Sequence, residues 1–79
     1  MDRTKIEGSS NIAEVGYDYD SRTMEVLFHN GNVYQYWPIT PSGWDSFLKS
    51  DSKGSFFAKH IRDNKGVSYR RLDDLQASK

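Results

Sequence analysis

The Asn30-Gly31 dipeptide, placed between two runs of alternating apolar residues, constrains this chain more than any other feature of its sequence. Asparagine and glycine both tolerate the positive φ that a two-residue type I′ turn requires. Apolar and polar residues alternate over residues 24–29 before the pair, and residues 32–37 follow it as a second extended run. The pattern predicts a β-hairpin.

The facing of the two hairpin strands depends on the length of this loop. If Asn30 and Gly31 are the whole loop, Phe28 pairs with Val33 and Leu27 pairs with Tyr34. That register gives an expected core face of Met24, Val26, Phe28, Val33 and Trp37, and an opposite face of Leu27, His29, Tyr34 and Tyr36. A longer loop would change these pairings, so the facing of the tyrosines stays conditional.

An earlier strand and two later helices complete the expected elements. Residues 12–19 alternate as in a half-buried strand. Thr40 followed by Pro41 is typical of an N-cap and the first helical position, and this helix should end near Ser50. Its expected buried stripe is Trp44, Phe47 and Leu48.

The second helix is expected to begin after a break at Lys53-Gly54. Ser55 is a suitable cap, and an apolar stripe of Phe57 and Ile61 extends to about Asp63. Residues 67–72 remain a candidate for a last short strand. The expected fold class is α+β, with a small antiparallel three-stranded sheet in the order β-β-β-α-α and two short helices packed on one face.

The predicted domain covers residues 10–72. Residues 1–9 and 73–79 are polar with little apolar periodicity, and we expect them to be flexible N-terminal and C-terminal tails. The chain has 79 residues and no cysteine, which excludes disulfides and thiolate chemistry and fits a cytoplasmic protein. No run of residues is apolar enough for a membrane span, and we expect a monomer without membrane contact.

No pattern of residues indicates catalysis or a bound metal. The two histidines, His29 and His60, lack metal-ligand spacing, and Asp18 with Asp20 is typical of a solvated turn. Nucleophile elbows and glycine-rich phosphate loops are absent from the sequence. We therefore expect a protein that is not an enzyme and that needs no cofactor and no metal.

Tyr34 and Tyr36 are the strongest candidates for a binding role. They lie two residues apart and so share one face of a strand. Nucleic-acid readers use such paired rings to stack unpaired bases. In a chain with so small a core, the same tyrosines could instead be half-buried sheet residues, and this alternative stays open.

Basic residues gather late in the chain. Residues 1–48 carry three basic and seven acidic side chains, whereas residues 49–72 carry seven basic and two acidic ones. The candidates for contacts to backbone phosphates are Lys59, Arg62, Arg70 and Arg71. Because the net charge of the whole chain is zero, these residues could equally be solvated charges on a surface.

Several short segments, in their order and spacing, resemble the KTSC domain. They are Ser9-Ser10-Asn11-Ile12, Gly16-Tyr17-Asp18, the run from Met24 to Phe28 before Gly31, the central Tyr34-Gln35-Tyr36, and Ser52 to Phe57 leading to His60-Ile61-Arg62. The resemblance spans about Ser9 to Leu72. It departs from the family pattern at residues 37–41, where an extra proline replaces a smoother valine-proline entry to the helix.

The resemblance implies more about domain boundaries than about activity. The family is named from the C-terminus of some lysyl-tRNA synthetases and also occurs as small stand-alone proteins of bacteria and phages. It has no established activity, and this association suggests RNA binding. We therefore expect a module that binds RNA or tRNA through Tyr34 and Tyr36 and the basic residues. A protein–protein interaction module of a bacterium or phage is the alternative, and capture of a small anionic ligand is a weaker third possibility.

Overall fold

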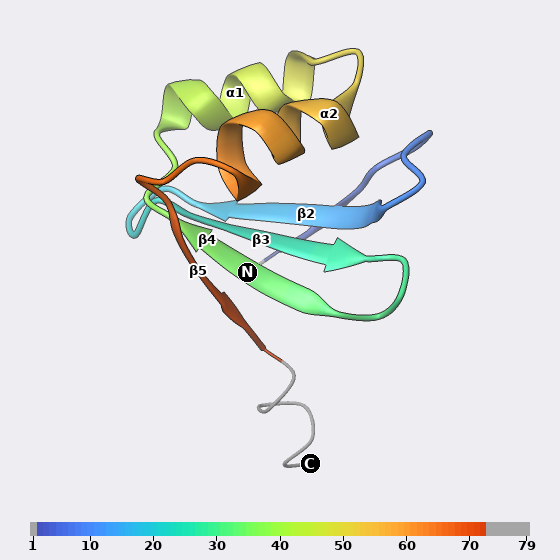
Figure 1. Cartoon of the computed structure of the whole chain (residues 1–79), viewed down its shortest axis with the longest axis horizontal. Helices are drawn as coiled ribbons and strands as arrows, with labels where there is room; N and C mark the ends of the chain where they lie inside the picture. Colours follow the sequence, from blue (N-terminus) through green and yellow to red (C-terminus); the bar gives the residue numbers. More distant parts are fainter. Residues whose placement is uncertain (1, 73–79) are drawn as a thin grey trace.

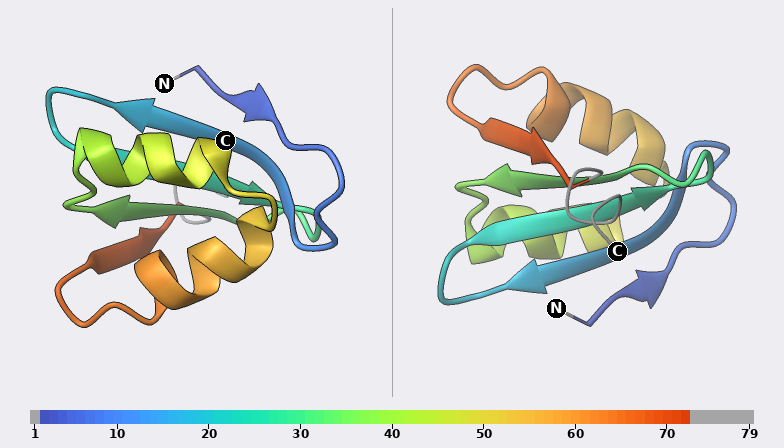
Figure 2. Two further views of the ribbon diagram at one scale, coloured as in Figure 1. Left: turned by 90° about the horizontal axis from the view of Figure 1, so that it is seen from above. Right: turned by 90° about the horizontal axis from the view of Figure 1, so that it is seen from below.

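The computed structural model describes residues 2–72. These residues form an antiparallel sheet with helices on one of its faces (Figure 1). The five strands lie in sequence order across the sheet. They are β1 (Thr4–Lys5), β2 (Ile12–Asp18), β3 (Thr23–Phe28), β4 (Val33–Trp37) and β5 (Ser68–Arg71). The helical layer consists of α1 (Pro41–Lys49), α2 (Lys53–Phe57) and a π-helical segment, η1 (Ala58–Arg62). Seen from above and below, the helices cover only one side of the sheet (Figure 2).

The α+β class and the two helices on one face are confirmed, but the sheet has two more strands than the three expected. One of them, β5, is the last short strand that residues 67–72 had suggested, and it pairs with β4. The other, β1, falls inside the predicted N-terminal tail and pairs with Val15 and Glu14 of β2. Ile6 follows β1 and is only 9% exposed, packed in the core. The boundary at residue 10 is therefore wrong for residues 4–6, while residues 73–79 lie outside the described part of the chain.

The hairpin loop is one residue longer than the predicted two-residue turn. Phe28 N donates to Asn32 O (2.9 Å) and Gly31 N donates to Phe28 O (2.9 Å), which leaves His29, Asn30 and Gly31 as the loop. Gly31 has φ 91°, and Asn30 does not have a positive φ. A turn that ends in one left-handed glycine is the usual three-residue hairpin loop.

This longer loop shifts the register and reverses the facing of β4. Val26 lies opposite Tyr34 and Met24 lies opposite Tyr36, so both tyrosines face the helices. Val33 and Trp37, which were expected in the core face, lie on the other side of the sheet. The sequence analysis made the facing of the tyrosines depend on a two-residue loop. Because the loop has three residues, the two faces of β4 are exchanged relative to that prediction.

Helix α1 begins as predicted and buries a narrower stripe. Thr40 Oγ1 accepts a hydrogen bond from Gly43 N (3.0 Å), and Pro41 occupies the first turn. Trp44 and Phe47 are buried, but Leu48 is 38% exposed. The prediction for Leu48 is wrong because α1 packs through Trp44, which stacks on Tyr17 of β2 (5.1 Å), and Phe47, which leaves Leu48 at the margin of the stripe.

The second helical segment starts earlier than predicted. Lys53 and Gly54, expected to break the pattern, form the first turn of α2, and Phe56 N donates to Ser52 O (3.0 Å). The helix then widens into η1, where Asp63 N donates to Ala58 O (3.1 Å). The helical segment still directs Phe57 and Ile61 into the core, as their spacing predicted.

Residues 37–41, where the sequence departs from the family pattern, connect β4 to α1 through a cis Trp37-Pro38 bond. Ile39 is 5% exposed, and its N–H donates to Arg22 O (2.8 Å). Its carbonyl accepts a hydrogen bond from the Tyr17 hydroxyl. The exit from the sheet is therefore held by hydrogen bonds to the β2–β3 connection and to β2 itself.

A polar network crosses the sheet face opposite the helices. Arg70 Nε and Nη2 donate to Gln35 Oε1 (3.2 and 3.1 Å), and Gln35 Nε2 donates to Glu25 Oε1 (3.0 Å). Arg3 Nη1 reaches Glu25 Oε2 (3.3 Å), and Arg3 Nε reaches Glu14 Oε1 (3.5 Å). Glu25, at 9% exposure, is therefore a nearly buried carboxylate with partners on both sides.

Tyr36 is the most buried tyrosine of the sheet, at 5% exposure. Burial, together with the nearby Tyr34, raises the pKa of Tyr36 to about 12 from an ordinary value of 10.0, against the smaller lowering effect of Arg62. The neutral hydroxyl is favoured in the folded state because the phenolate would lose its hydration.

Removing the Glu25 carboxylate should destabilise the fold. Glu25→Ala removes the acceptor of Gln35 Nε2 and one of the two carboxylates that pair with Arg3, and we expect a loss of about 1–3 kcal/mol in the free energy of unfolding, measured by urea denaturation. Asp45→Ala is the matched control, because Asp45 forms an exposed pair with Lys49 (2.9 Å) on α1 and should cost only about 0.5 kcal/mol. Equal losses in the free energy of unfolding for the two variants would show that the network around Glu25 stabilises the fold no more than an exposed ion pair does.

The raised Tyr36 pKa predicts a loss of stability in base. The folded state keeps the Tyr36 proton more tightly than the unfolded state, so its contribution is complete below pH 10 and disappears as the pH rises through about 12. Unfolding curves across this range should show a steeper decline for the wild type than for Tyr36→Phe, which has no proton to lose. Parallel declines would contradict the assignment.

Candidate functional site

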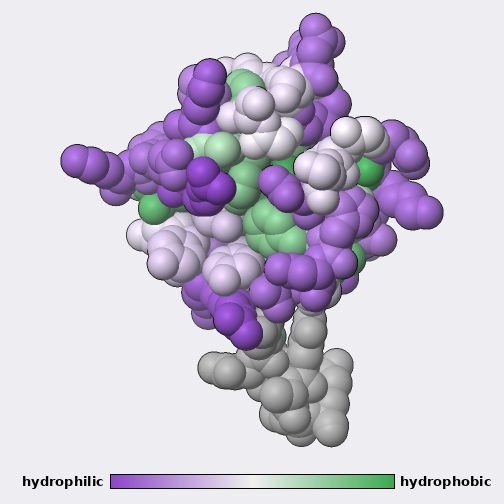
Figure 3. All heavy atoms as spheres, turned by 45° about the vertical axis from the view of Figure 1, so that its right-hand side comes forward, coloured by the Kyte–Doolittle hydropathy of each residue, from purple (hydrophilic) through white to green (hydrophobic). Residues whose placement is uncertain are grey.

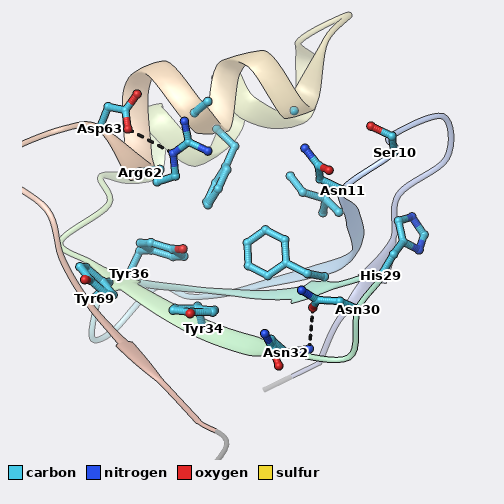
Figure 4. A pocket seen from close by; sticks show the side chains of 15 residues that line it. Ser10, Asn11, His29, Asn30, Asn32, Tyr34, Tyr36, Arg62, Asp63 and Tyr69 are labelled. Carbon is cyan, nitrogen blue, oxygen red and sulfur yellow. Dashed lines mark hydrogen bonds and ion pairs between the residues drawn. The ribbon is translucent and has the colours of Figure 1, made fainter.

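An open groove of about 930 Å³ lies between the second helical segment and strands β3 to β5. Figure 3 shows apolar atoms exposed at the centre of this side of the molecule, surrounded by hydrophilic ones. Figure 4 shows that the lining side chains come from the sheet below, the helix above and the Ser10–Asn11 loop at one end. Its aromatic lining residues are Phe28, Tyr34, Tyr36, Phe57 and Tyr69.

Three of these rings form a row of tyrosines across β4 and β5. Tyr34 and Tyr36 stack with centroids 6.2 Å apart and an interplanar angle of 21°. Tyr69, opposite Tyr36 in the β4–β5 pairing, lies 6.1 Å from Tyr36 and 6.2 Å from Tyr34. Exposure differs along the row, from 5% for Tyr36 to 66% for Tyr69. Tyr69 and the half-buried Tyr34 therefore present ring surface to solvent.

Two phenylalanines pack against the tyrosine row, one from the helix and one from the sheet. Phe57 of α2 meets Tyr36 edge to face, with centroids 5.1 Å apart. Phe28 of β3 meets Tyr34 and Phe57 in the same way, at 5.7 Å from each. These edge-to-face contacts fix the orientation of the rings.

Arg62 and Asp63 stand at the edge of the groove nearest Tyr36. Arg62 Nε donates to Asp63 Oδ1 (3.1 Å), and this hydrogen bond, together with the Asp63 charge, raises the pKa of the Arg62 guanidinium. The pair is exposed, and each side chain retains about 60% of its surface in solvent (59% and 62%). The positive charge at the groove edge is therefore largely balanced by an adjacent carboxylate.

Of the six predicted site residues, Tyr34, Tyr36 and Arg62 line the groove. Arg70 lies on the opposite face of the sheet, where it contacts Gln35 and lies over the Trp37 ring at 6.0 Å. Lys59 is exposed on η1 and does not line the groove. Arg71 pairs with Tyr34 at the sheet edge but is not a lining residue either.

Sequence reasoning missed Tyr69 and the side-chain amides of the groove. Tyr69 reaches the tyrosine row only because β5 pairs with β4, which no local pattern indicates. The amides come from two loops distant in sequence, and they are Asn11, Asn30 and Asn32. Only a prediction of how β5 pairs with β4 could have placed Tyr69 beside Tyr36.

Among residues 2–72, no cluster of histidine and carboxylate side chains is arranged to hold a metal ion. Over the same residues, no helix has the length and apolar character that crossing a membrane requires.

The chain is similar in sequence to part of a large enzyme and to a small uncharacterized protein. It is 34% identical over 58 residues to a lysine–tRNA ligase of Nostoc punctiforme, a match that covers 73% of this chain but only 10% of the ligase. It is 35% identical over 49 residues to an uncharacterized protein of Stutzerimonas stutzeri, covering 62% of this chain and 69% of that protein. The chain thus spans about a tenth of the ligase that it matches.

A solved structure supports the fold throughout. The crystal structure of a KTSC domain protein from Yersinia pestis superposes with a TM-score of 0.76 at 31% identity, covering 89% of this chain and 94% of that one. The family model of the KTSC domain matches residues 8–64, which include β2 to β4 and both helical segments. On these matches, together with the fold, the chain belongs to the KTSC domain family.

Proposed function

We propose that this chain is a non-catalytic RNA-binding module that holds an unpaired base in the groove, against Tyr34 and Tyr69. The observation that carries the proposal is the row of three tyrosine rings packed against Phe28 and Phe57, with its outer ring 66% exposed. Flat π surfaces of this kind stack bases with little regard to their identity, and each stack contributes about 1–3 kcal/mol.

The three tyrosines have different roles in this proposal. Tyr36, at 5% exposure, supports the outer rings from within the core. Tyr34 and Tyr69 provide the contact surface, so the predicted pair of Tyr34 and Tyr36 becomes the pair of Tyr34 and Tyr69. The groove, at about 930 Å³, is at the upper end of the usual range for ligand sites and has room for more than one ring.

Phosphate contacts have a small part in the proposed binding. Arg62 is the one predicted cation that lines the groove, and Asp63 already accepts a hydrogen bond from it. Affinity would then come mainly from stacking. The relationship to part of a lysine–tRNA ligase supports RNA as the ligand, without identifying which RNA.

A protein-interaction module is the second candidate, favoured by strand β5. All four of its residues are exposed, and β5 is an edge strand of the sheet. An exposed edge can pair with a strand of another protein. This function would use the sheet edge instead of the interior of the groove.

Loss of the outer rings should weaken RNA binding. Tyr34→Ala and Tyr69→Ala should each lower the affinity for a mixed-sequence single-stranded RNA by about tenfold, measured by fluorescence anisotropy. Tyr19→Ala is the matched control because Tyr19 is 63% exposed and lies outside the groove. Full affinity in folded Tyr34→Ala and Tyr69→Ala variants would refute the stacking role.

The charge balance at the groove predicts a shallow salt dependence. If one phosphate is contacted, the logarithm of the binding constant should fall with a slope of about −0.7 against the logarithm of the salt concentration. Arg62→Gln should bring this slope close to zero and leave most of the affinity. A slope several times steeper would indicate that the basic residues outside the groove, and not the tyrosines, hold the RNA.

A further inference from the structure

The aromatic groove does not end at the Ser10–Asn11 loop. A second hollow of about 430 Å³ adjoins it, and the two share four lining residues, Ser10, Asn11, Gly54 and Ala58. The shared residues are small or polar, and Gly54 contributes no side chain. The two hollows therefore meet at these residues, with the tyrosine row at the far end of the first hollow and the start of α2 lining the second.

The second hollow has a different chemistry from the first. None of its lining residues is aromatic, and serine hydroxyls come from both of its sides. Ser9 Oγ is occupied, since it accepts hydrogen bonds from Asn11 N (3.3 Å) and Ile12 N (3.1 Å). The hydroxyls of Ser10 and Ser55 have no partner within residues 2–72, so both remain able to donate to or accept from a ligand.

The charges of the second hollow disfavour a phosphate there. Glu7 and Asp51 line it with one cation, Lys53, whose Nζ already donates to Ser50 O (3.1 Å). Carboxylates repel a phosphate but accept hydrogen bonds from sugar hydroxyls, as acidic residues do with a ribose in dinucleotide sites. The hollow thus suits a neutral group rich in hydroxyls.

We infer that this second hollow is a ribose subsite, in which Ser10 and Ser55 bind the 2′-hydroxyl of a nucleotide whose base, or whose neighbour's base, occupies the aromatic groove. The inference rests on the proposed function and adds a selectivity to it. Stacking on tyrosines does not distinguish RNA from DNA, whereas a contact to the 2′-hydroxyl does. The subsite makes the module selective for RNA.

The test compares two oligonucleotides of one mixed sequence, with uracil in both, that differ only in carrying ribose or 2′-deoxyribose. The wild type should bind the ribose form about fivefold or more tightly than the deoxyribose form, the expected effect of one or two hydrogen bonds. The double variant Ser10→Ala and Ser55→Ala should bind both forms equally, at the affinity of the deoxyribose form. Ser46→Ala, which removes an exposed serine hydroxyl from α1, should keep the preference.

The readout separates failure of the subsite from failure of the groove. Amide NMR spectra during titration should show shifts at Tyr34 and Tyr69 with both oligonucleotides, and at Ser52 and Ser55, which line the second hollow alone, with the ribose form alone. Equal affinity of the wild type for both forms, or a preference that survives the double variant, would overturn the subsite and leave base stacking intact. No shift with either oligonucleotide would overturn the subsite together with the proposed function.

Discussion

The pairing of β3 with β4 is the constraint on which the rest of this structure depends. It places Tyr34 opposite Val26 and Tyr36 opposite Met24, and so directs both tyrosines toward the helices. The left-handed Gly31 (φ 91°) sets the pairing by closing a three-residue loop. With a loop one residue shorter, Tyr34 and Tyr36 would lie on the open face, and the groove would lose both of these rings from its lining.

As a result, the two faces of the sheet differ in chemistry, one being apolar and aromatic and the other more polar. The helix face holds the apolar core and, at its margin, the tyrosine row. The opposite face carries the network from Arg70 through Gln35 and Glu25 to Arg3, which links β5 and β4 to β3 and to the residues before β1. Arg70 thus serves the sheet as a cross-strand partner, although its charge and position in the chain suggest a nucleic-acid contact.

Local patterns predicted the elements well and their partners poorly. The N-cap at Thr40, the proline that follows it and the extended runs of β2 and β3 are short-range signals, and the structure has a helix start and two strands at these positions. A register shift between Ile12 and Glu14 interrupts the alternation of β2. Strand β1 was not predicted, because its two residues are too few to show alternation. The facing of Tyr34 and Tyr36 was not predicted, because it depends on the length of the hairpin loop. The Asn-Gly pair is compatible with both a two-residue and a three-residue loop, and the backbone geometry at Gly31 decides between them. Tyr69 joins the site through a strand pairing that depends on the whole fold.

The groove draws its residues from the N-terminal loop, β3, β4, the second helical segment and β5, so no consecutive pair of elements contains it. The complete groove is consequently present only in the completed fold. A ligand held there would contact the N-terminal loop, the second helical segment and the last strand, β5, and would stabilise the native state by mass action. Any substitution that weakens docking of β5 would lower apparent affinity in proportion to the fraction of molecules with the groove assembled, without touching the ligand.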